Sequence, residues 1–208
     1  MSATFPGVAA LLLAAGAGRR LGAPKALLRD ADGVPWVERA ARRLVQAGCG
    51  PVVVVVGARA AEAAALVPPA LVPARDVVEA VGWNEGMGAS LRAGLVALAG
   101  RTPAPDAVLV ALVDTPGMTV DVVRRVAATA ELGPSVLARA AFDGVPGHPV
   151  LLGREHWAGV RAAATGDAGA RGYLSARRVR LVECGDVGSG VDVDTRAALV
   201  AVPPIVGG

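Results

Sequence analysis

Short apolar runs, separated by polar and glycine-rich stretches, divide the chain into expected strands and helices. Residues 8–15, 51–56 and 107–113 are continuous apolar runs that are too short for a typical helix. Such runs are typical of strands that are buried on both faces of a parallel sheet. The run of five valines in residues 51–56 is the clearest case, because β-branched side chains favour strands. We expect further strands over residues 77–80, 136–142 and 179–184.

Between these runs the apolar positions recur with a helical period. Residues 35–47 carry apolar side chains at helical spacing, and Gly48 follows them as a typical C-terminal glycine. We expect further helices over residues 60–66, in a segment that ends near Ala99, over residues 120–132, and after Thr195. Alternating strands and helices predict a parallel sheet with right-handed crossovers. We therefore predict one doubly wound, mostly parallel α/β domain of the Rossmann-like type over residues 1–202, with a flexible tail at 203–208.

Composition excludes several classes of protein. Hydrophobic residues make up 53% of the chain and aromatic residues only 3%, so the core must consist of Ala, Val and Leu. The net charge of +3 is scattered, whereas a nucleic-acid surface needs a basic patch with stacking aromatics. Cys49 and Cys184 show neither metal-ligand spacing nor a disulfide framework. The pI near 9.5 mildly favours anionic ligands.

The first apolar run resembles the hydrophobic core of a signal peptide in length only. Arg19 and Arg20 follow the run and no cation precedes it, which is the reverse of the order in a signal peptide. No apolar run reaches the length that crosses a bilayer. We expect a soluble protein of the reducing cytoplasm with no membrane and no nucleic acid among its partners.

The loop after the first run carries the clearest chemistry. It combines three glycines with three cations: Gly16, Gly18, Gly22, Arg19, Arg20 and Lys25. Glycines let backbone N–H groups approach a ligand closely, and such donors together with fixed positive charge suit a polyphosphate. The alternative is an ordinary strand–helix turn with solvated arginines, but a turn does not need the cations. We predict a nucleoside-triphosphate site at the carboxyl end of the first strand.

Two familiar phosphate loops do not fit this stretch. The Walker pattern requires Gly-Lys-Ser/Thr, whereas Ala-Pro-Lys-Ala follows Gly22. In the dinucleotide pattern the third glycine would come one residue earlier, and an acid would follow the second strand. Here the valine run ends in Gly57-Ala58-Arg59, which contains no acid.

Residues 13–28 instead resemble the signature loop of the nucleotidyltransferases that mature the molybdenum cofactor, the cytidylyltransferases in particular. The resemblance rests on Leu-Ala-Ala-Gly at 13–16, then Arg20, Gly22 and Lys25 followed by Ala-Leu-Leu. It implies that the loop wraps a triphosphate and that Lys25 touches the phosphates. In the empty site we expect the Lys25 side chain to be exposed. The residues expected at the nucleotide are Ala14, Ala15, Gly16, Ala17, Gly18, Arg19, Arg20, Gly22 and Lys25.

Residues 83–91, Trp-Asn-Glu-Gly-Met-Gly-Ala-Ser-Leu, resemble the segment of the same family that closes over base and ribose. The resemblance implies that Asn84, Gly88 and Ser90 lie near the nucleotide. Glycines at a helix entrance also let the backbone face a ligand. The alternative is a capped loop in which the Trp and the Met are core residues.

Asp114 follows the third strong strand in an Asp-Thr-Pro context. An acid at the carboxyl end of a central parallel strand lies in the crevice where α/β proteins bind ligands, and a carboxylate suits Mg²⁺. Thr119 and Asp121 are better placed to cap the next helix, which leaves Asp114 free. The resemblance pairs Asp114 with metal and implies a second metal ligand at Asp192, with Asp194 in reserve. The alternative for the second site is that Asp194 or Thr195 caps the last helix.

Two later segments resemble the substrate side of the same family. Gly-His-Pro-Val-Leu-Leu-Gly at 147–153 contains His148, and residues 166–171 end in Arg171. His148 has three open roles, as a general base, a metal ligand or a structural residue. Arg171 suits the anionic phosphate of an acceptor, and a solvated helix arginine is the alternative. The resemblance implies that both residues bind the acceptor.

The resemblance spans residues 13–195 and implies a Mg²⁺-dependent nucleotidyltransferase. In that case CMP moves from CTP to a phosphorylated acceptor, molybdopterin, pyrophosphate leaves, and a molybdoenzyme or chaperone receives the product. Lys25, Arg20 and Asp114 would be catalytic, and Ala15 stands where guanylyl-transferring relatives carry Gly, which favours a pyrimidine. Two alternatives stay open. One is a guanylyl or sugar-phosphate nucleotidyltransferase of the same fold, and the other is a dinucleotide-binding oxidoreductase or a non-catalytic nucleotide sensor.

Overall fold

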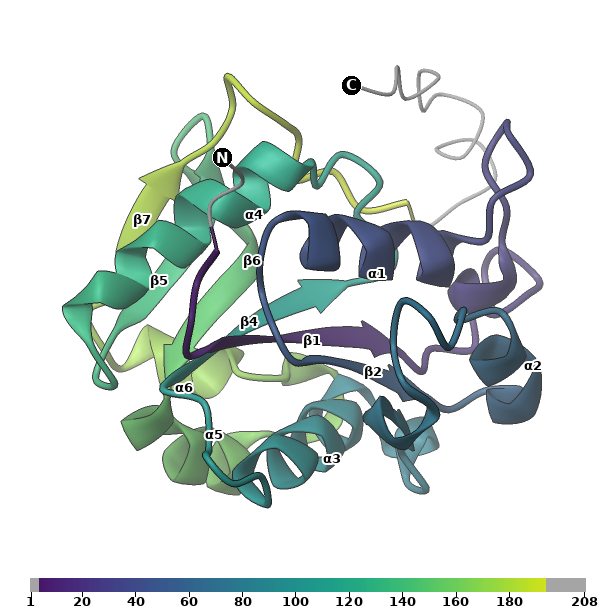
Figure 1. The fold of residues 1–208 in the computed structure, drawn as a ribbon, viewed down its shortest axis with the longest axis horizontal. Coiled ribbons are helices and arrows are strands. Elements are labelled where there is room, and N and C mark those ends of the chain that lie inside the picture. The colour runs from purple at the N-terminus through teal and green to yellow at the C-terminus, as the bar shows by residue number, and fades with distance from the viewer. Residues whose placement is uncertain (1–3, 194–208) are drawn as a thin grey trace.

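A seven-stranded sheet runs through the centre of the molecule (Figure 1). The computed structural model describes residues 4–193. In spatial order the strands are β3 (Val77–Glu79), β2 (Val52–Val56), β1 (Val8–Ala14), β4 (Ala107–Leu112), β6 (Val145–Gly153), β5 (Leu137–Phe142) and β7 (Arg180–Glu183). Only the β4–β6 and β5–β6 pairs are antiparallel among these described strands. The predicted single, mostly parallel α/β sheet is therefore confirmed.

Helices cover both faces of this sheet. In Figure 1, α1 (Trp36–Gln46) and α4 (Val120–Ala127) lie on one face, and α3 (Met87–Ala99), α5 (Trp157–Ala163) and α6 (Arg171–Ser175) lie on the other. The short helix α2 (Ala60–Ala65) follows β2. The α1 helix ends as predicted, because Gly48 after it has a φ of 90°. The helix expected over residues 120–132 tightens into a 3₁₀ turn after Ala127.

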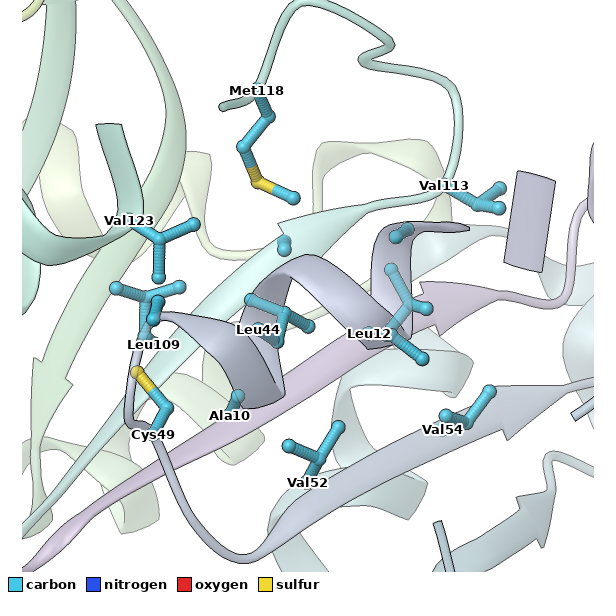
Figure 2. Packing of buried hydrophobic residues seen from close by; sticks show 14 of the residues in the cluster. Ala10, Leu12, Leu44, Cys49, Val52, Val54, Leu109, Val113, Met118 and Val123 are labelled. Atoms are coloured by element: carbon cyan, nitrogen blue, oxygen red, sulfur yellow. The ribbon is translucent and has the colours of Figure 1, made fainter. Parts of the chain in front are cut away.

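The core has two halves because the central strands are apolar at every position. On β1, Ala10 and Leu12 face α1 and α4, whereas Leu11 and Leu13 face α3 and α5. Figure 2 shows the first half, where Leu44 of α1 packs over β1, and both leucines at positions 12 and 44 have no exposed area. Burying one such leucine contributes about 1.5–3 kcal/mol. The strand β1 contains no polar residue because helices cover both of its faces.

The strand β6 is the main departure from the sequence prediction, which placed no strand over residues 145–153. Asp143 and Gly144 have φ values of 52° and 77°. Two successive left-handed residues form the tight turn that returns a strand against its neighbour, and Asp-Gly is a preferred pair for it. The chain therefore comes back as β6, which inserts between β5 and β4 in antiparallel orientation.

The carboxyl ends of β1, β2 and β4 meet at one edge of the sheet, since the three strands are parallel. This edge receives the glycine-rich loop after β1 and Asp114 after β4, as predicted. No helix within residues 4–193 is both long enough and apolar enough to cross a bilayer. Asp194, the expected closing helix and the expected tail lie outside the described residues.

Candidate active site

The glycine-rich loop after β1 folds back on itself. The backbone N–H groups of Leu21 and Gly22 both donate to the carbonyl oxygen of Gly18, at 2.8 and 2.9 Å. Gly18 has a φ of 58°, and a Cβ there would lie 1.9 Å from the carbonyl oxygen of Ala23. Only glycine fits, so this position is fixed by the turn. At Gly16 a Cβ would meet nothing within 4 Å, so the absence of a side chain there leaves the backbone open to a ligand.

A cavity of about 610 Å³ opens between this loop and the ends of β1 and β4. Of the residues that the sequence predicts, it is lined by Ala15, Gly16, Ala17, Gly18, Arg19, Arg20, Lys25, Asn84, Ser90, Asp114, Arg171 and Asp192. The volume is in the range of pockets that hold a small-molecule ligand. Five separate stretches of sequence thus converge on one space.

Lys25 and Asp114, which both line the cavity, form an ion pair. The Lys25 Nζ lies 2.5 Å from Asp114 Oδ2, and the two side chains are only 14% and 19% exposed. This corrects the expectation that the Lys25 side chain is exposed, and it shows that one oxygen of Asp114 is already engaged. The expectation for the cap of α4 is confirmed, since Thr119 Oγ1 accepts a hydrogen bond from Val122 N at 3.2 Å.

The second oxygen of Asp114 is open to a further ligand. Asp114 Oδ1 is buried and accepts no hydrogen bond within the part of the chain that the structure describes. Asp192 lines the same cavity. No cluster of three or more His, Cys, Asp or Glu side chains that could hold a metal occurs among residues 4–193. A pair of carboxylates is nevertheless what Mg²⁺ uses when substrate phosphates and water complete its shell, so the residues present fit that ion.

Two further segments reach the cavity because glycines let them pack closely. A Cβ on Gly86, before α3, would lie 2.4 Å from the carbonyl carbon of Gly166. A Cβ on Gly88 would lie 2.8 Å from Ala164 in the same way. Residues 164–167 therefore rest directly on the start of α3. This contact brings Asp167 and Arg171 to the same cavity as Asn84.

His148 lies on β6 beside the site rather than in its lining. Its pKa is lowered to about 4, chiefly by burial and then by the positive charge of Arg139, while Asp114 acts in the opposite direction. The imidazole is therefore neutral near pH 7. Arg139 donates two hydrogen bonds to the carbonyl oxygen of Gly147, at 3.0 and 3.1 Å, which holds the peptide next to His148.

The sequence prediction of the site was incomplete in two ways. The described lining of the cavity omits four predicted residues: Ala14, Gly22, Gly88 and His148. Ala14 is buried at the end of β1, and Gly22 closes the loop turn. The lining also contains seven residues that were not predicted as site residues: Leu13, Trp83, Gly86, Met87, Leu112, Val113 and Asp167. Most of these residues could have been predicted from their positions within or beside the quoted motifs. The packing of Gly86 on Gly166, which brings Asp167 to the cavity, could not be predicted from the sequence.

Comparison with known proteins identifies the family. The model of the MobA-like NTP transferase domain matches residues 10–181, which is most of the chain. The chain belongs to the MobA-like NTP transferase family. Membership places it in the nucleotidyltransferase class of enzymes and confirms the predicted resemblance at that level. The match begins within β1 and ends within β7, so it covers the loop, the α3 entrance and Asp114.

One relative of this MobA-like chain is named for an oxidoreductase activity. The chain is 39% identical, over 92% of its length and 94% of the relative's, to a protein named nicotine blue oxidoreductase from Paenarthrobacter nicotinovorans. Its fold matches the crystal structure of Rv0371c from Mycobacterium tuberculosis H37Rv, with a TM-score of 0.75, 27% identity, and coverage of 95% and 98% of the two chains. A structure of Rv0371c in complex with manganese matches with a TM-score of 0.69 and 26% identity over 94% and 99% of the chains.

Proposed function

We propose that this MobA-like protein transfers CMP from CTP to a phosphorylated acceptor, molybdopterin, and releases pyrophosphate. The observation that carries the proposal is the cavity in which the glycine-rich loop, its cations and the Asp114–Asp192 carboxylates meet. Fixed cations and backbone donors suit a triphosphate, and a pair of carboxylates suits the divalent cation that accompanies it.

In the proposed reaction an oxygen of the acceptor phosphate attacks the α-phosphorus of CTP. The bond from that phosphorus to the oxygen of the β-phosphate breaks, and pyrophosphate carries the negative charge away. Little covalent chemistry falls to the protein, so positioning and charge stabilisation supply the catalysis. Lys25 and Arg20, which line the loop side of the cavity, stabilise the charge on the leaving pyrophosphate. Arg171, which also lines the cavity, holds the acceptor phosphate.

Asp114 and Asp192 would hold the divalent cation. When bound, a Mg²⁺ ion supplies Lewis-acid stabilisation of the phosphate oxygens. The partnerless Asp114 Oδ1 is available for it at once, whereas Oδ2 is engaged by Lys25. The Lys25 ammonium has three donors, so it can contact the phosphates while Oδ2 still accepts one of them. The manganese complex of Rv0371c supports divalent-cation binding by a protein of this fold.

The preference for a pyrimidine rests on Ala15. Its side chain lines the cavity and is 4% exposed. A Cβ on the neighbouring Gly57 would lie 2.8 Å from the Ala15 methyl group and 2.6 Å from Trp83 Cβ, so these groups already fill this corner. A larger purine would need this corner to widen. The smaller cytosine ring is the better match.

The proposal is tested with the purified protein, Mg²⁺, molybdopterin and each of the four ribonucleoside triphosphates, with pyrophosphate release as the readout. We expect release with CTP that depends on both the acceptor and the metal, and that disappears in EDTA. The Asp114→Asn variant serves as the inactive control. If pyrophosphate were released with a sugar phosphate and not with molybdopterin, the proposed acceptor would be wrong. If GTP were preferred over CTP, the proposed nucleotide would be wrong.

A second candidate function is favoured by the relative named nicotine blue oxidoreductase. In that case the glycine-rich loop would bind the pyrophosphate of a nicotinamide dinucleotide. The sheet gives this candidate less support, because no acid follows β2 to bind the ribose hydroxyls of such a cofactor. In that position Gly57 is packed between Ala15 and Trp83, and Arg59 is exposed and paired with Glu62.

The two candidates separate in a direct comparison. NADH and NADPH are titrated into the protein with their fluorescence as the readout, against CTP as competitor. Nucleotidyl transfer predicts that CTP with Mg²⁺ binds and that neither dinucleotide is oxidised when an electron-accepting dye is added. Tight binding and oxidation of NADPH, without pyrophosphate release from CTP, would establish the oxidoreductase.

A further inference from the structure

The segment that brings Asp192 back to the cavity crosses most of one half of the sheet. We call residues 184–193 the return segment. It leaves β7, which β5 and β6 separate from β4 and Asp114. Neighbouring strands lie about 4.8 Å apart, so the segment has to cover roughly 14 Å. A chain of this kind, without strand or helix, places a carboxylate accurately only if its neighbours fix it along the way.

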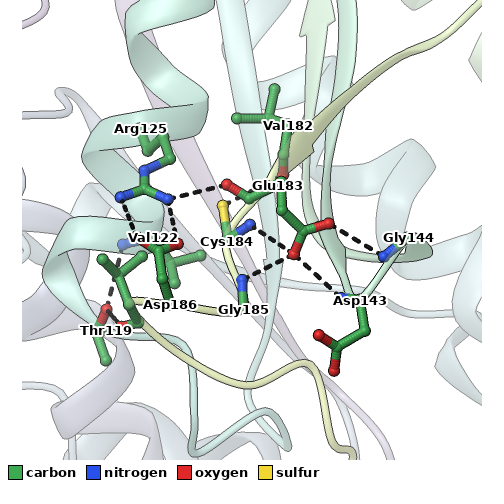
Figure 3. Close-up of polar contacts among 11 residues, drawn as sticks. Thr119, Val122, Arg125, Asp143, Gly144, Val182, Glu183, Cys184, Gly185 and Asp186 are labelled. Atoms are coloured by element: carbon green, nitrogen blue, oxygen red, sulfur yellow. Dashed lines mark hydrogen bonds and ion pairs between the residues drawn. The ribbon is translucent and has the colours of Figure 1, made fainter.

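The start of the return segment is fixed by Glu183, the last residue of β7. Its carboxylate accepts hydrogen bonds from the backbone N–H groups of Asp143 and Gly144 at 3.0 Å, Gly185 at 2.9 Å and Cys184 at 3.2 Å (Figure 3). These donors lower the pKa of Glu183, with those of Gly185 and Gly144 first. The side chain thus ties the β5–β6 turn to the first residues of the segment.

Arg125 of α4 holds the same start from the other side. Its guanidinium donates to the carbonyl oxygen of Glu183 at 3.0 Å and to both carboxylate oxygens of Asp186 (Figure 3). A planar guanidinium that meets a carboxylate with two parallel hydrogen bonds fixes direction as well as distance. The helix α4 therefore serves as the support along which the segment runs.

The middle of the segment rests on the first turn of α4. Thr119, the N-cap residue, uses its hydroxyl twice: it accepts from Val122 N and donates to the carbonyl oxygen of Val187 at 2.8 Å. At Gly188 a Cβ would lie 2.5 Å from Val122 Cγ2 and 2.7 Å from the carbonyl oxygen of Gly117. The segment is so close to the helix here that no side chain fits between them.

The end of the segment is hydrogen-bonded to the loop that contains Asp114. Ser189 N donates to the carbonyl oxygen of Gly117 at 3.0 Å, and Val193 N donates to that of Asp114 at 2.9 Å. Val193 is fully buried. Asp192 is therefore flanked by backbone contacts that run to the Asp114 loop itself, and its position follows from where the segment settles on α4.

We propose that Thr119 and Gly188 are positioning residues for the metal site. By setting how closely the return segment lies on α4, they hold the Asp192 carboxylate at the cavity with that of Asp114. The inference rests on the proposed function, which assigns Asp192 to the divalent cation. Neither residue lines the cavity, so their effect on the cation acts through Asp192.

The test measures binding of Mn²⁺ alone to the full chain, by electron paramagnetic resonance of the free ion. Thr119→Val removes the hydroxyl at nearly constant volume, Thr119→Ser keeps it, and Gly188→Ala forces the segment away from α4. We expect Thr119→Val and Gly188→Ala to weaken Mn²⁺ about tenfold, the scale on which supporting residues affect metal sites. Thr119→Ser should bind Mn²⁺ as the parent does. Gly100→Ala is the matched control, because its Cβ would meet nothing closer than 3.7 Å.

Two further measurements separate positioning from simple stabilisation. Binding of CTP in EDTA should change less than about twofold in every variant, because the glycine-rich loop is not touched. Asp192→Asn is titrated in parallel. If Asp192→Asn weakens Mn²⁺ but Thr119→Val lowers only the melting temperature, the two residues merely stabilise the fold and the inference is wrong. If Asp192→Asn leaves Mn²⁺ affinity unchanged, the metal assignment of the proposed function fails instead.

Discussion

Lys25 is the most informative residue to change, because one substitution should move two measurements in opposite directions. Lys25→Met keeps the aliphatic stem and removes the ammonium group, which lies 2.5 Å from Asp114 Oδ2. Both side chains are mostly buried, so the contact is a partly desolvated, charge-assisted hydrogen bond. A bond of this kind contributes about 1.5–3 kcal/mol.

Turnover should fall about 100-fold in Lys25→Met, the scale for the loss of one preorganised charge that stabilises a transition state. The affinity for Mn²⁺ in the absence of nucleotide should rise instead. The ammonium group and a divalent cation compete for Asp114, and removing the competitor returns part of the energy of the ion pair to the metal. If about half of it, roughly 0.75–1.5 kcal/mol, is returned, the dissociation constant for Mn²⁺ falls about three- to twelvefold, since 1.4 kcal/mol corresponds to one decade.

The assay pairs steady-state pyrophosphate release from CTP with Mn²⁺ titration of the nucleotide-free protein. Arg154→Met is a matched control, because it removes an exposed cation that pairs with Asp106 outside the cavity. Lys25 is the only lysine in the sequence, so an amine-specific label followed by mass spectrometry reports on this side chain directly. CTP should slow its labelling. Weaker Mn²⁺ binding in Lys25→Met would refute the competition between the ammonium group and the cation for Asp114. Near-normal turnover at saturating CTP would refute the role of Lys25 in stabilising the transition state.

Three further predictions follow from single side chains. Asp114→Asn should abolish metal-dependent turnover while it leaves some nucleotide binding, which calorimetric titration of CTP with and without Mg²⁺ checks; an active variant would contradict the metal assignment. The parent should prefer CTP over GTP by one to two orders of magnitude in kcat/KM, about 1–3 kcal/mol, and Ala15→Gly should narrow that ratio by improving GTP; equal use of both by the parent would exclude the role of the methyl group. His148, with a pKa lowered to about 4 against 6.5 for the free side chain, stays neutral in the fold. The unfolded state then binds more protons between pH 6.5 and 4, so stability should fall by at most about 3 kcal/mol as the pH drops through that window. Denaturant melts of His148→Gln should show a flatter dependence, and an unchanged pH profile would rule out a buried neutral imidazole.

The strands were predictable where burial on both faces removed every polar position. For β1, β2 and β4 the expected runs agree with the observed strands to within one residue at each end. The antiparallel strand β6 was not predicted, although Asp143-Gly144 is a strong hairpin signal. Its sequence, with two prolines and two glycines in nine residues, has little of the composition of a strand. Pairing with neighbours on both sides overrides that local preference.

The site was predictable as a set of motifs and not as a geometry. The motifs placed Lys25 in the loop after the first strand and Asp114 at the carboxyl end of a later strand, yet their direct ion pair depends on how the loop folds back over Gly18. Asp167 reaches the cavity only because Gly86 allows residues 164–167 to rest on α3. Such contacts join segments about eighty residues apart in the chain. No local pattern encodes them.

The oxidoreductase relative makes the carboxylates, rather than the phosphate loop, the decisive part of the site. A loop that binds a triphosphate can also bind the pyrophosphate of a dinucleotide, so the fold and the loop leave both chemistries possible. Nucleotidyl transfer needs a divalent cation beside the phosphates, whereas a dinucleotide-dependent oxidation does not. Asp114 and Asp192 are therefore the residues whose loss separates the two. A protein that lost pyrophosphate release in Asp114→Asn and never oxidised NADPH would be a nucleotidyltransferase, and one whose NADPH oxidation survived the substitution would have kept the family's fold for a different reaction.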